Sequence, residues 1–217
     1  MNNIKNVLVA LVLVSLASCA PSTQIVKIWQ APGVTVTSNS TNRTLVIALV
    51  KDEGSRQIIE NELVKKFKMD RAVASYTILP IDSLKRGNKN LLAQAIAQGH
   101  FNYILMMRLN NVKDETTYDP NTSSYTGTTQ IASNVSIGVY YDTYDNYFGY
   151  SSGFYVTPDY YSKTKSYYVE TTVYSVNPNK LIWNCTTQTV NPKKMDKAIS
   201  SIADAVTDAM ENNRFLQ

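Results

Sequence analysis

The sequence predicts one α/β domain, with about three helices packed on a mixed β-sheet, behind a short export signal. Two runs, 44–50 and 103–109, are almost continuously β-branched or aliphatic, as in strands that are buried on both faces. Segments whose apolar residues recur at helical spacing lie between and after these runs. Two alternating segments, 167–176 and 181–190, flank a turn and predict a hairpin. Strands that alternate with helices and close with a hairpin indicate a layered α/β domain.

The first 18 residues have the layout of a secretion signal. Lys5 precedes an almost unbroken apolar run over 7–16, and a short basic region before such a run is typical of a signal peptide. A membrane-spanning helix needs roughly twenty apolar residues, so the run is short for a permanent anchor. Two alternatives for this segment are an ordinary cleaved signal peptide and a single-pass membrane anchor.

The run ends in Leu-Ala-Ser-Cys at 16–19, which resembles the bacterial lipobox. The resemblance implies cleavage between Ser18 and Cys19 and a diacylglyceryl group on the Cys19 thiol. Each buried methylene contributes roughly 0.8 kcal/mol, so two or three acyl chains would hold the protein on a membrane. Residues 19–24 would form a lipidated tether, and 25–217 the anchored domain.

Sorting within the envelope is inferred from the second mature position. Ala20 stands there, instead of the aspartate that retains lipoproteins at the inner membrane in many Gram-negative bacteria. We therefore expect the outer membrane, with the domain facing the periplasm.

Turn and capping residues set the expected element boundaries. Asp52 or Ser55 can cap the first helix, and Pro80 ends the strand predicted over 73–79. Gly99 is placed to cap a second helix in the left-handed conformation, and Asn191 with Pro192 to begin a third. The expected elements are, in order, strand 25–29, loop 30–43, strand 44–50, helix 55–68, strand 73–79, helix 88–98, strand 103–109, an insertion, hairpin strands 167–176 and 181–190, and a helix with Met195, Ile199, Ile202, Val206 and Met210 on its inner side.

The insertion, 113–166, has an unusual composition. Twelve of the fifteen tyrosines lie between Tyr118 and Tyr168. Alternation over 131–141 predicts a strand, and 142–155 predicts an exposed aromatic loop. Tyrosine offers a wide flat face and a hydroxyl at low entropic cost, which suits recognition, although an extension of the sheet or a low-complexity loop would have the same composition. The candidate partner-binding residues are Tyr144, Tyr147, Phe148, Tyr150, Phe154 and Tyr155.

Composition limits the kinds of partner and cofactor. The formal net charge is +4 with no block of basic residues, so nucleic-acid binding has little support. If Cys19 is lipidated, Cys185 has no disulfide partner, and its strand-like setting predicts a buried thiol. With one histidine, His100, a zinc site is implausible. We expect no cofactor and no metal.

Catalytic patterns are incomplete. Residues 149–153 match the Gly-x-Ser-x-Gly elbow but lack the buried strand before it, and His100 precedes the serine instead of following it. Glu60 and Glu62 are expected on a solvated helix face, and Glu170 is expected to be isolated, so no acid pair for glycoside hydrolysis is predicted.

Strand 44–50 with its helix, strand 103–109, and the closing hairpin before a C-terminal helix together resemble small bacterial envelope lipoproteins with one α/β domain. That group is similar to auxiliary lipoproteins of envelope transport and assembly machines, which bind partners and catalyse nothing. The resemblance implies a non-enzymatic adaptor. The alternative is a glycan- or peptidoglycan-binding lipoprotein that uses the aromatic insertion, and an envelope hydrolase is a third hypothesis.

Overall fold

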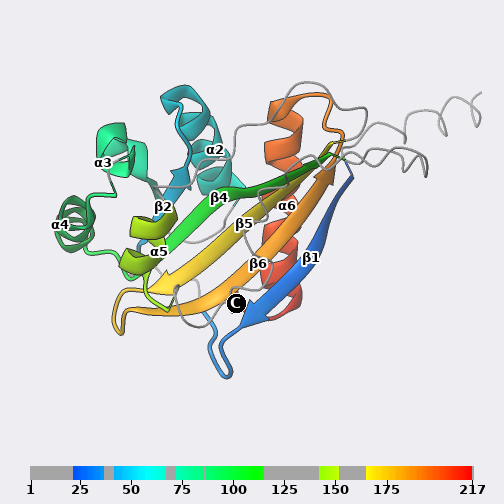
Figure 1. The fold of residues 1–217 in the computed structure, drawn as a ribbon. Helices are drawn as coiled ribbons and strands as arrows, with labels where there is room; N and C mark the ends of the chain where they lie inside the picture. Colours follow the sequence, from blue (N-terminus) through cyan, green and yellow to red (C-terminus); the bar gives the residue numbers. More distant parts are fainter. Residues whose placement is uncertain are drawn as a thin grey trace, which may run out of the picture.

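The computed structural model describes residues 22–36, 42–66, 72–85, 87–114, 142–151 and 165–216. Their core is a six-stranded mixed sheet with the strand order β1-β6-β5-β4-β2-β3 (Figure 1). The predicted α/β class, with helices layered on a mixed sheet, is confirmed. The signal peptide, Cys19 and the strand predicted over 131–141 lie outside the described residues. Among those that are described, no helix is long and apolar enough to cross a membrane.

The elements alternate as the sequence predicted in the first half and close with strands and a helix. In chain order they are β1 (Ser22–Gln30), β2 (Thr44–Leu49), α2 (Glu53–Lys66), β3 (Ala72–Ala74), the 3₁₀ turn η1 (Ser75–Thr77), α3 (Ile81–Lys85), α4 (Lys89–Gly99), β4 (Tyr103–Asp114), α5 (Tyr144–Ser151), β5 (Lys165–Ser175), β6 (Lys180–Val190) and α6 (Met195–Asn212).

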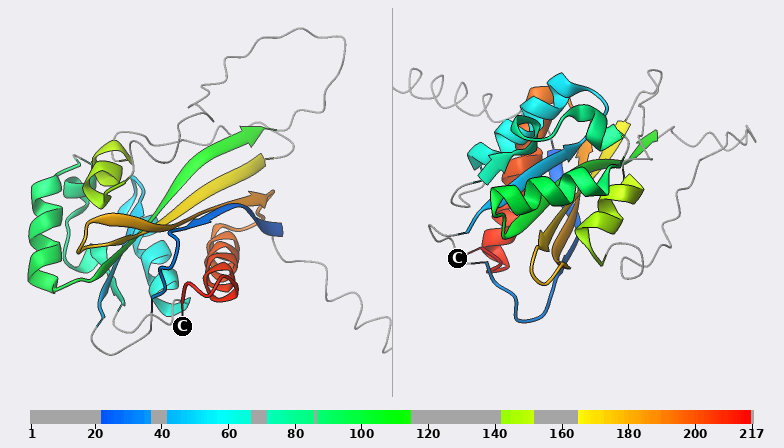
Figure 2. Two further views of the ribbon diagram at one scale, coloured as in Figure 1. Left: turned by 90° about the horizontal axis from the view of Figure 1, so that it is seen from below. Right: turned by 90° about the vertical axis from the view of Figure 1, so that its left-hand side faces the viewer.

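Helices cover the two faces of the sheet unequally. Helices α2 and α6 pack on one face, where Trp183 stacks on Phe215 with ring centroids 5.8 Å apart. Helices α3, α4 and α5 pack on the other face, over the half of the sheet that contains β2 and β4 (Figure 2). Every residue of β2 is buried, as its unbroken apolar sequence predicted.

Strand β2 pairs in parallel with β3 and β4, whereas β4, β5, β6 and β1 pair antiparallel in succession. The hairpin predicted near the end is therefore confirmed as β5 and β6. Strand β1, the first in sequence, lies at the outer edge beside β6. It begins at Ser22, three residues inside the segment that was expected to be tether.

Two predicted boundaries near helix ends are wrong for local reasons. Gly99 is the last residue of α4, and His100 takes the left-handed position with φ 51°. A Cβ on Gly99 would lie 2.1 Å from Cε2 of Phe101, so glycine is needed there for space. Helix α6 begins at Met195 instead of Pro192, because the Asn191 side chain accepts a hydrogen bond from the backbone N–H of Lys165 at 2.7 Å. Asn191 thus closes the β5–β6 pair.

The strand predicted over 73–79 is also shorter than expected. Strand β3 stops at Ala74, and the chain turns at Ser75 into η1. The turn brings the Ser75 hydroxyl to 2.6 Å from Oε1 of Glu60. By contrast, the N-terminal cap predicted for the first helix is confirmed: Oδ2 of Asp52 accepts from the N–H of Ser55 at 2.7 Å.

Candidate functional site

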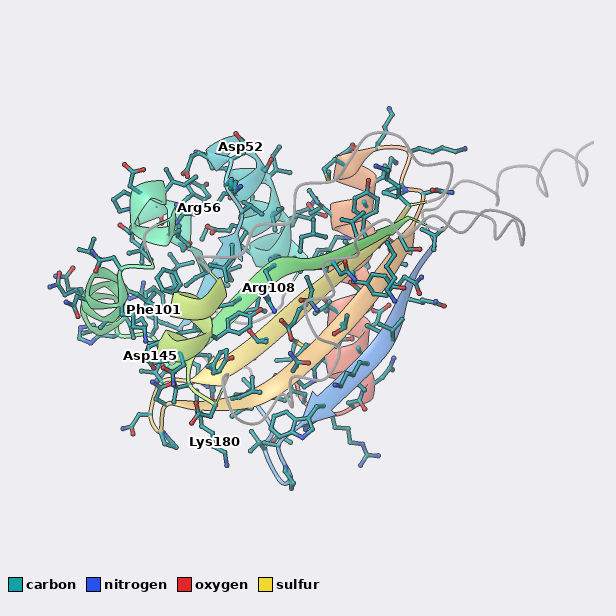
Figure 3. The ribbon with its side chains drawn as sticks, viewed as in Figure 1. Asp52, Arg56, Phe101, Arg108, Asp145 and Lys180 are labelled. Atoms are coloured by element: carbon teal, nitrogen blue, oxygen red, sulfur yellow. The ribbon has the colours of Figure 1, made fainter. Side chains whose placement is uncertain are left out.

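A buried polar cluster lies on the sheet face that carries α5. Arg108 of β4 and Glu170 of β5 are paired in register, and Asn184 of β6 lies beside them. Nε of Arg108 is 2.9 Å from Oε2 of Glu170, and Nδ2 of Asn184 donates to the other carboxylate oxygen at 3.2 Å. The Tyr147 hydroxyl of α5 donates to Oε2 at 3.1 Å. We call these four residues the Glu170 cluster, and Figure 3 labels one of them, Arg108.

The electrostatics of the Glu170 cluster keep the Tyr147 phenol protonated. All four side chains are buried. Burial, reinforced by the negative charge of Glu170, raises the pKa of Tyr147 well above its ordinary value, so the phenol stays protonated and donates. The Arg108 guanidinium also lies over the Tyr147 ring, 5.4 Å from its centroid. The cluster therefore fixes α5 to the sheet through one hydroxyl and one cation–π contact.

The chemistry of the Glu170 cluster suits a structural role and not catalysis. A general acid or base must come within hydrogen-bonding distance of a substrate atom. The Glu170 carboxylate instead accepts from three protein donors, and Arg108 also donates to Oδ1 of Asn110 at 3.1 Å. Oδ1 of Asn184 has no partner among the described residues. Glu170, which stands alone among strand residues in the sequence, gains partners in the fold because β4 and β6 place a cation and an amide against it.

A second buried ion pair joins α2 to the turn after β3. Arg56 and Glu60 are both fully buried, with Nε of Arg56 3.1 Å from Oε1 of Glu60. The Arg56 guanidinium also donates to the Leu79 carbonyl at 2.9 Å and to the Ser75 hydroxyl at 2.8 Å. Glu60 accepts from the backbone N–H of Ala48 at 2.9 Å. The predicted solvated position of Glu60 is therefore wrong.

The aromatic candidates of the insertion divide into three groups. Tyr147 and Phe148 are fully buried, so their predicted exposure in a loop is wrong. The reason is that 144–151 forms helix α5, which places positions 144, 147 and 148 on one face against the sheet. Tyr144 is half-buried, and Asn179 accepts from its N–H at 3.1 Å. Tyr150 lies in α5, and the remaining candidates, Phe154 and Tyr155, lie outside the described residues.

The structure also shows the positions of Cys185 and His100, which the sequence analysis discussed. Cys185 is buried as predicted, and burial with the nearby Glu170 charge raises the pKa of its thiol to about 12. His100 lies at the end of α4. In the described segments, no three His, Cys, Asp or Glu side chains come together as metal ligands would.

An exposed surface remains on β1, and we call it the β1 edge. Val26, Ile28 and Trp29 have 45%, 37% and 39% of their surface exposed. Within the part of the chain that the structure describes, β1 pairs only with β6. The backbone groups on its outer side are therefore open to a further strand. The sequence predicted the strand, but its place at the edge depends on the strand order.

Comparison with known proteins gives no family. No family model matches the sequence, and no curated protein matches it at a significant level. Two solved structures of the PelC dodecamer from Paraburkholderia phytofirmans resemble the chain at 10% identity. One, a point variant, has a TM-score of 0.40 over 83% of this chain and 95% of its own. The other has a TM-score of 0.41 over 86% and 96%.

Proposed function

We propose that this chain is a non-enzymatic, lipid-anchored component of the bacterial cell envelope that binds a protein partner along the β1 edge. The observation that carries the proposal is the position of β1. This strand begins at Ser22, three positions after the proposed lipidation site Cys19, and it is an edge strand of the sheet. The segment next to the anchor is thus also the segment with an open backbone edge.

The chemistry of the β1 edge supports a protein partner. A partner strand can pair with an open edge through main-chain hydrogen bonds, while side-chain contacts supply specificity. Three large apolar side chains on one edge strand, Val26, Ile28 and Trp29, would be buried by such a partner. Lys27 and the bulge between Ile25 and Lys27 interrupt the edge. Such features are typical of edges that avoid unselective pairing with other strands.

A non-enzymatic role is supported by how the buried ionisable groups are used. Glu60 and Glu170 each accept several protein hydrogen bonds. A shallow groove of about 280 Å³ between α2 and α6 contains none of these groups. It is lined by Ile58, Glu62, Asp196, Lys197, Ile199 and Ser200. Glu60 and Glu170 therefore act within the fold.

The anchor is tested by replacing the cysteine. We expect Cys19→Ala to abolish incorporation of labelled palmitate and to move the protein from the membrane fraction into the soluble fraction, or to leave it uncleaved, because the acyl chains supply the membrane affinity. Cys185→Ala is the matched control and is expected to label like the wild type, since that thiol is buried. Wild-type labelling of the Cys19→Ala protein would exclude the proposed anchor.

The partner surface is tested by site-specific photo-cross-linking in cells. A photoreactive amino acid at Val26 or Ile28 is expected to give one discrete protein adduct, identified by mass spectrometry. The matched control is Ile78, whose exposed fraction of 43% is similar but which lies after η1, away from β1. The same adduct from position 78, or none from β1, would contradict the proposed surface.

Glycan binding is the second candidate, and one observation favours it. Trp29 faces the same side of the sheet as Gln24 and Gln188, whose side chains are hydrogen-bonded at 3.0 Å. An exposed indole offers a face on which sugars can stack, and amide side chains on the same side of the sheet can hydrogen-bond to sugar hydroxyls. Sedimentation of the full chain with purified cell wall, lost in Trp29→Ala and retained in Ile78→Ala, would favour this candidate over a protein partner.

A further inference from the structure

One end of the sheet contains the start of β1. Ser22 pairs with Val190 at the end of β6, and Val190 pairs with Ser166 at the start of β5. Ser166 in turn pairs with Lys113 near the end of β4. The start of α6 follows four residues after Asn191, at the same end (Figures 1 and 2). We call this the anchor end; the β5–β6 turn lies at the opposite end.

The tether brings the anchor end close to the membrane. Ser22 lies three positions after Cys19 in the sequence, so a fully extended tether spans only about 10 Å. The four strands at this end lie side by side at about 4.8 Å spacing, so β4 lies only about 14 Å from β1. Electrostatic attraction acts over about 8–10 Å at physiological salt. Charges at the anchor end are therefore within reach of lipid headgroups.

The anchor end is basic. Lys113 near the end of β4 is exposed, and Lys165 begins β5. The stretch 191–197 carries three exposed lysines against one aspartate, Asp196. Asp114, the last residue of β4, pairs in register with Lys165 and lies at the same end. Two acids, Asp114 and Asp196, thus stand against five lysines at the anchor end: Lys113, Lys165, Lys193, Lys194 and Lys197.

An exposed apolar side chain stands among these lysines. Met195, the first residue of α6, has 66% of its surface exposed, the largest value among the exposed large hydrophobic residues described. Basic side chains that surround an exposed apolar residue are typical of surfaces that lie on anionic bilayers, where the apolar group enters the headgroup boundary.

We propose that the anchor end is a membrane-contacting surface, in which the lysines bind anionic phospholipid headgroups and Met195 enters the headgroup layer. The inference rests on the proposed lipid anchor at Cys19. It fixes the orientation of the domain: the strands rise from the membrane, α4 and the β5–β6 turn point away from it, and the β1 edge stands upright along the side. A partner would then meet the β1 edge from the side, parallel to the membrane plane.

The orientation is tested with two matched probes. Lys194→Cys at the anchor end and Lys180→Cys at the far end replace exposed lysines with a labelling site, and Lys180 is labelled in Figure 3. Cys185 is buried, and its thiol pKa is raised to about 12, so it is not labelled. The lipidated full chain is reconstituted into vesicles of phosphatidylethanolamine and phosphatidylglycerol with nitroxide-headgroup lipid. We expect severalfold stronger quenching of the probe at position 194 than of the probe at position 180.

The role of charge is tested in the same vesicles. We expect quenching at position 194 to weaken when phosphatidylcholine replaces phosphatidylglycerol and when salt is raised. Adding Lys193→Gln and Lys197→Gln should remove this lipid dependence, whereas the matched pair Lys65→Gln and Lys89→Gln should leave it unchanged. Far-ultraviolet circular dichroism checks that each variant is folded.

The outcomes separate the two proposals. Absence of acyl groups on Cys19 by mass spectrometry would overturn the anchor and, with it, the proposed function. An acylated protein whose two probes are quenched equally would overturn the membrane-contacting surface alone. Quenching at position 194 that does not depend on phosphatidylglycerol would also overturn the binding of anionic headgroups.

Discussion

Replacing Arg56 by methionine is expected to lower the free energy of unfolding by about 3–5 kcal/mol, the cost typical of breaking a buried ion pair by removing one partner. Methionine fills much of the same volume, so a cavity contributes little. The loss comes from Glu60, which would remain buried with its charge uncompensated. The Leu79 carbonyl and the Ser75 hydroxyl would lose a donor as well.

Urea unfolding of the wild type and the variant measures this loss. Lys65→Met on the same helix is the matched control, because Lys65 is exposed, and it is expected to change stability by less than about 0.5 kcal/mol. Adding Glu60→Met to Arg56→Met removes the unpaired charge. The double variant is therefore expected to regain part of the loss, though not all, because the N–H groups of Ala48 and Tyr76 lose their acceptor. A loss below about 1 kcal/mol in Arg56→Met would contradict the assigned role.

The stability of the Arg56→Met protein should also depend on pH in a defined direction. Burial raises the pKa of Glu60 above its ordinary value of 4.5, against the opposing effects of Ser75, Ala48 and Arg56. Without Arg56 the folded-state pKa of Glu60 rises further, so the folded protein binds more protons than the unfolded chain between pH 4.5 and that folded-state pKa. Stability then falls as pH rises. We expect the difference from the wild type to grow as the pH rises above 4.5, and to shrink on acidification toward that value.

The Arg56–Glu60 pair shows how far sequence reasoning could go. The two residues are four apart on a predicted helix, a spacing that is common for exposed pairs on helix surfaces. Their burial depends on the turn at Ser75 and on the Leu79 carbonyl, both of which come from a segment that was predicted to be a strand. Helix periodicity identified the helix, but only the tertiary contact decides which face is covered.

The insertion shows a different limit. Its scarcity of aliphatic residues favoured an exposed loop, yet positions 144, 147 and 148 have the spacing of one helix face. That spacing was a signal for α5, and the tyrosine-rich composition obscured it. By contrast, the strands β2, β4, β5 and β6 followed directly from apolar continuity or alternation, because their side chains are buried on one or both faces.

The order of strands in the sheet is the third feature that could not be predicted from the sequence. The sequence predicts that 25–29 is a strand, but nothing local to it shows that it pairs with β6, the strand most distant in the chain. Both proposed surfaces, the β1 edge and the anchor end, depend on this pairing. The lysines at 193 and 194 come to the same end of the sheet as Ser22 only through this pairing, so sequence reasoning could not assign them to the anchor end.

Replacing Glu170 by leucine is expected to destabilise the fold by about 3–5 kcal/mol as well, because Arg108 would be left buried without its counter-charge. The Tyr147 hydroxyl and the Asn184 amide would lose their acceptor at the same time. Since Tyr147 is the residue through which α5 reaches the cluster, the loss should be accompanied by faster hydrogen exchange in α5 than in α6. Tyr147→Phe removes one hydrogen bond and should cost only about 0.5–1.5 kcal/mol.

A second variant at Glu170 tests whether the Arg108–Glu170 pair has a structural role or a functional one. In the Arg108→Met/Glu170→Leu double variant the charge imbalance is gone, and replacing both members of a buried pair by apolar residues is often neutral or stabilising. We expect it to recover much of the stability lost by Glu170→Leu, and the photo-cross-link from the β1 edge to remain. A stable double variant that loses this adduct would contradict the structural role, because the charges, and not the fold they support, would then be what the partner requires.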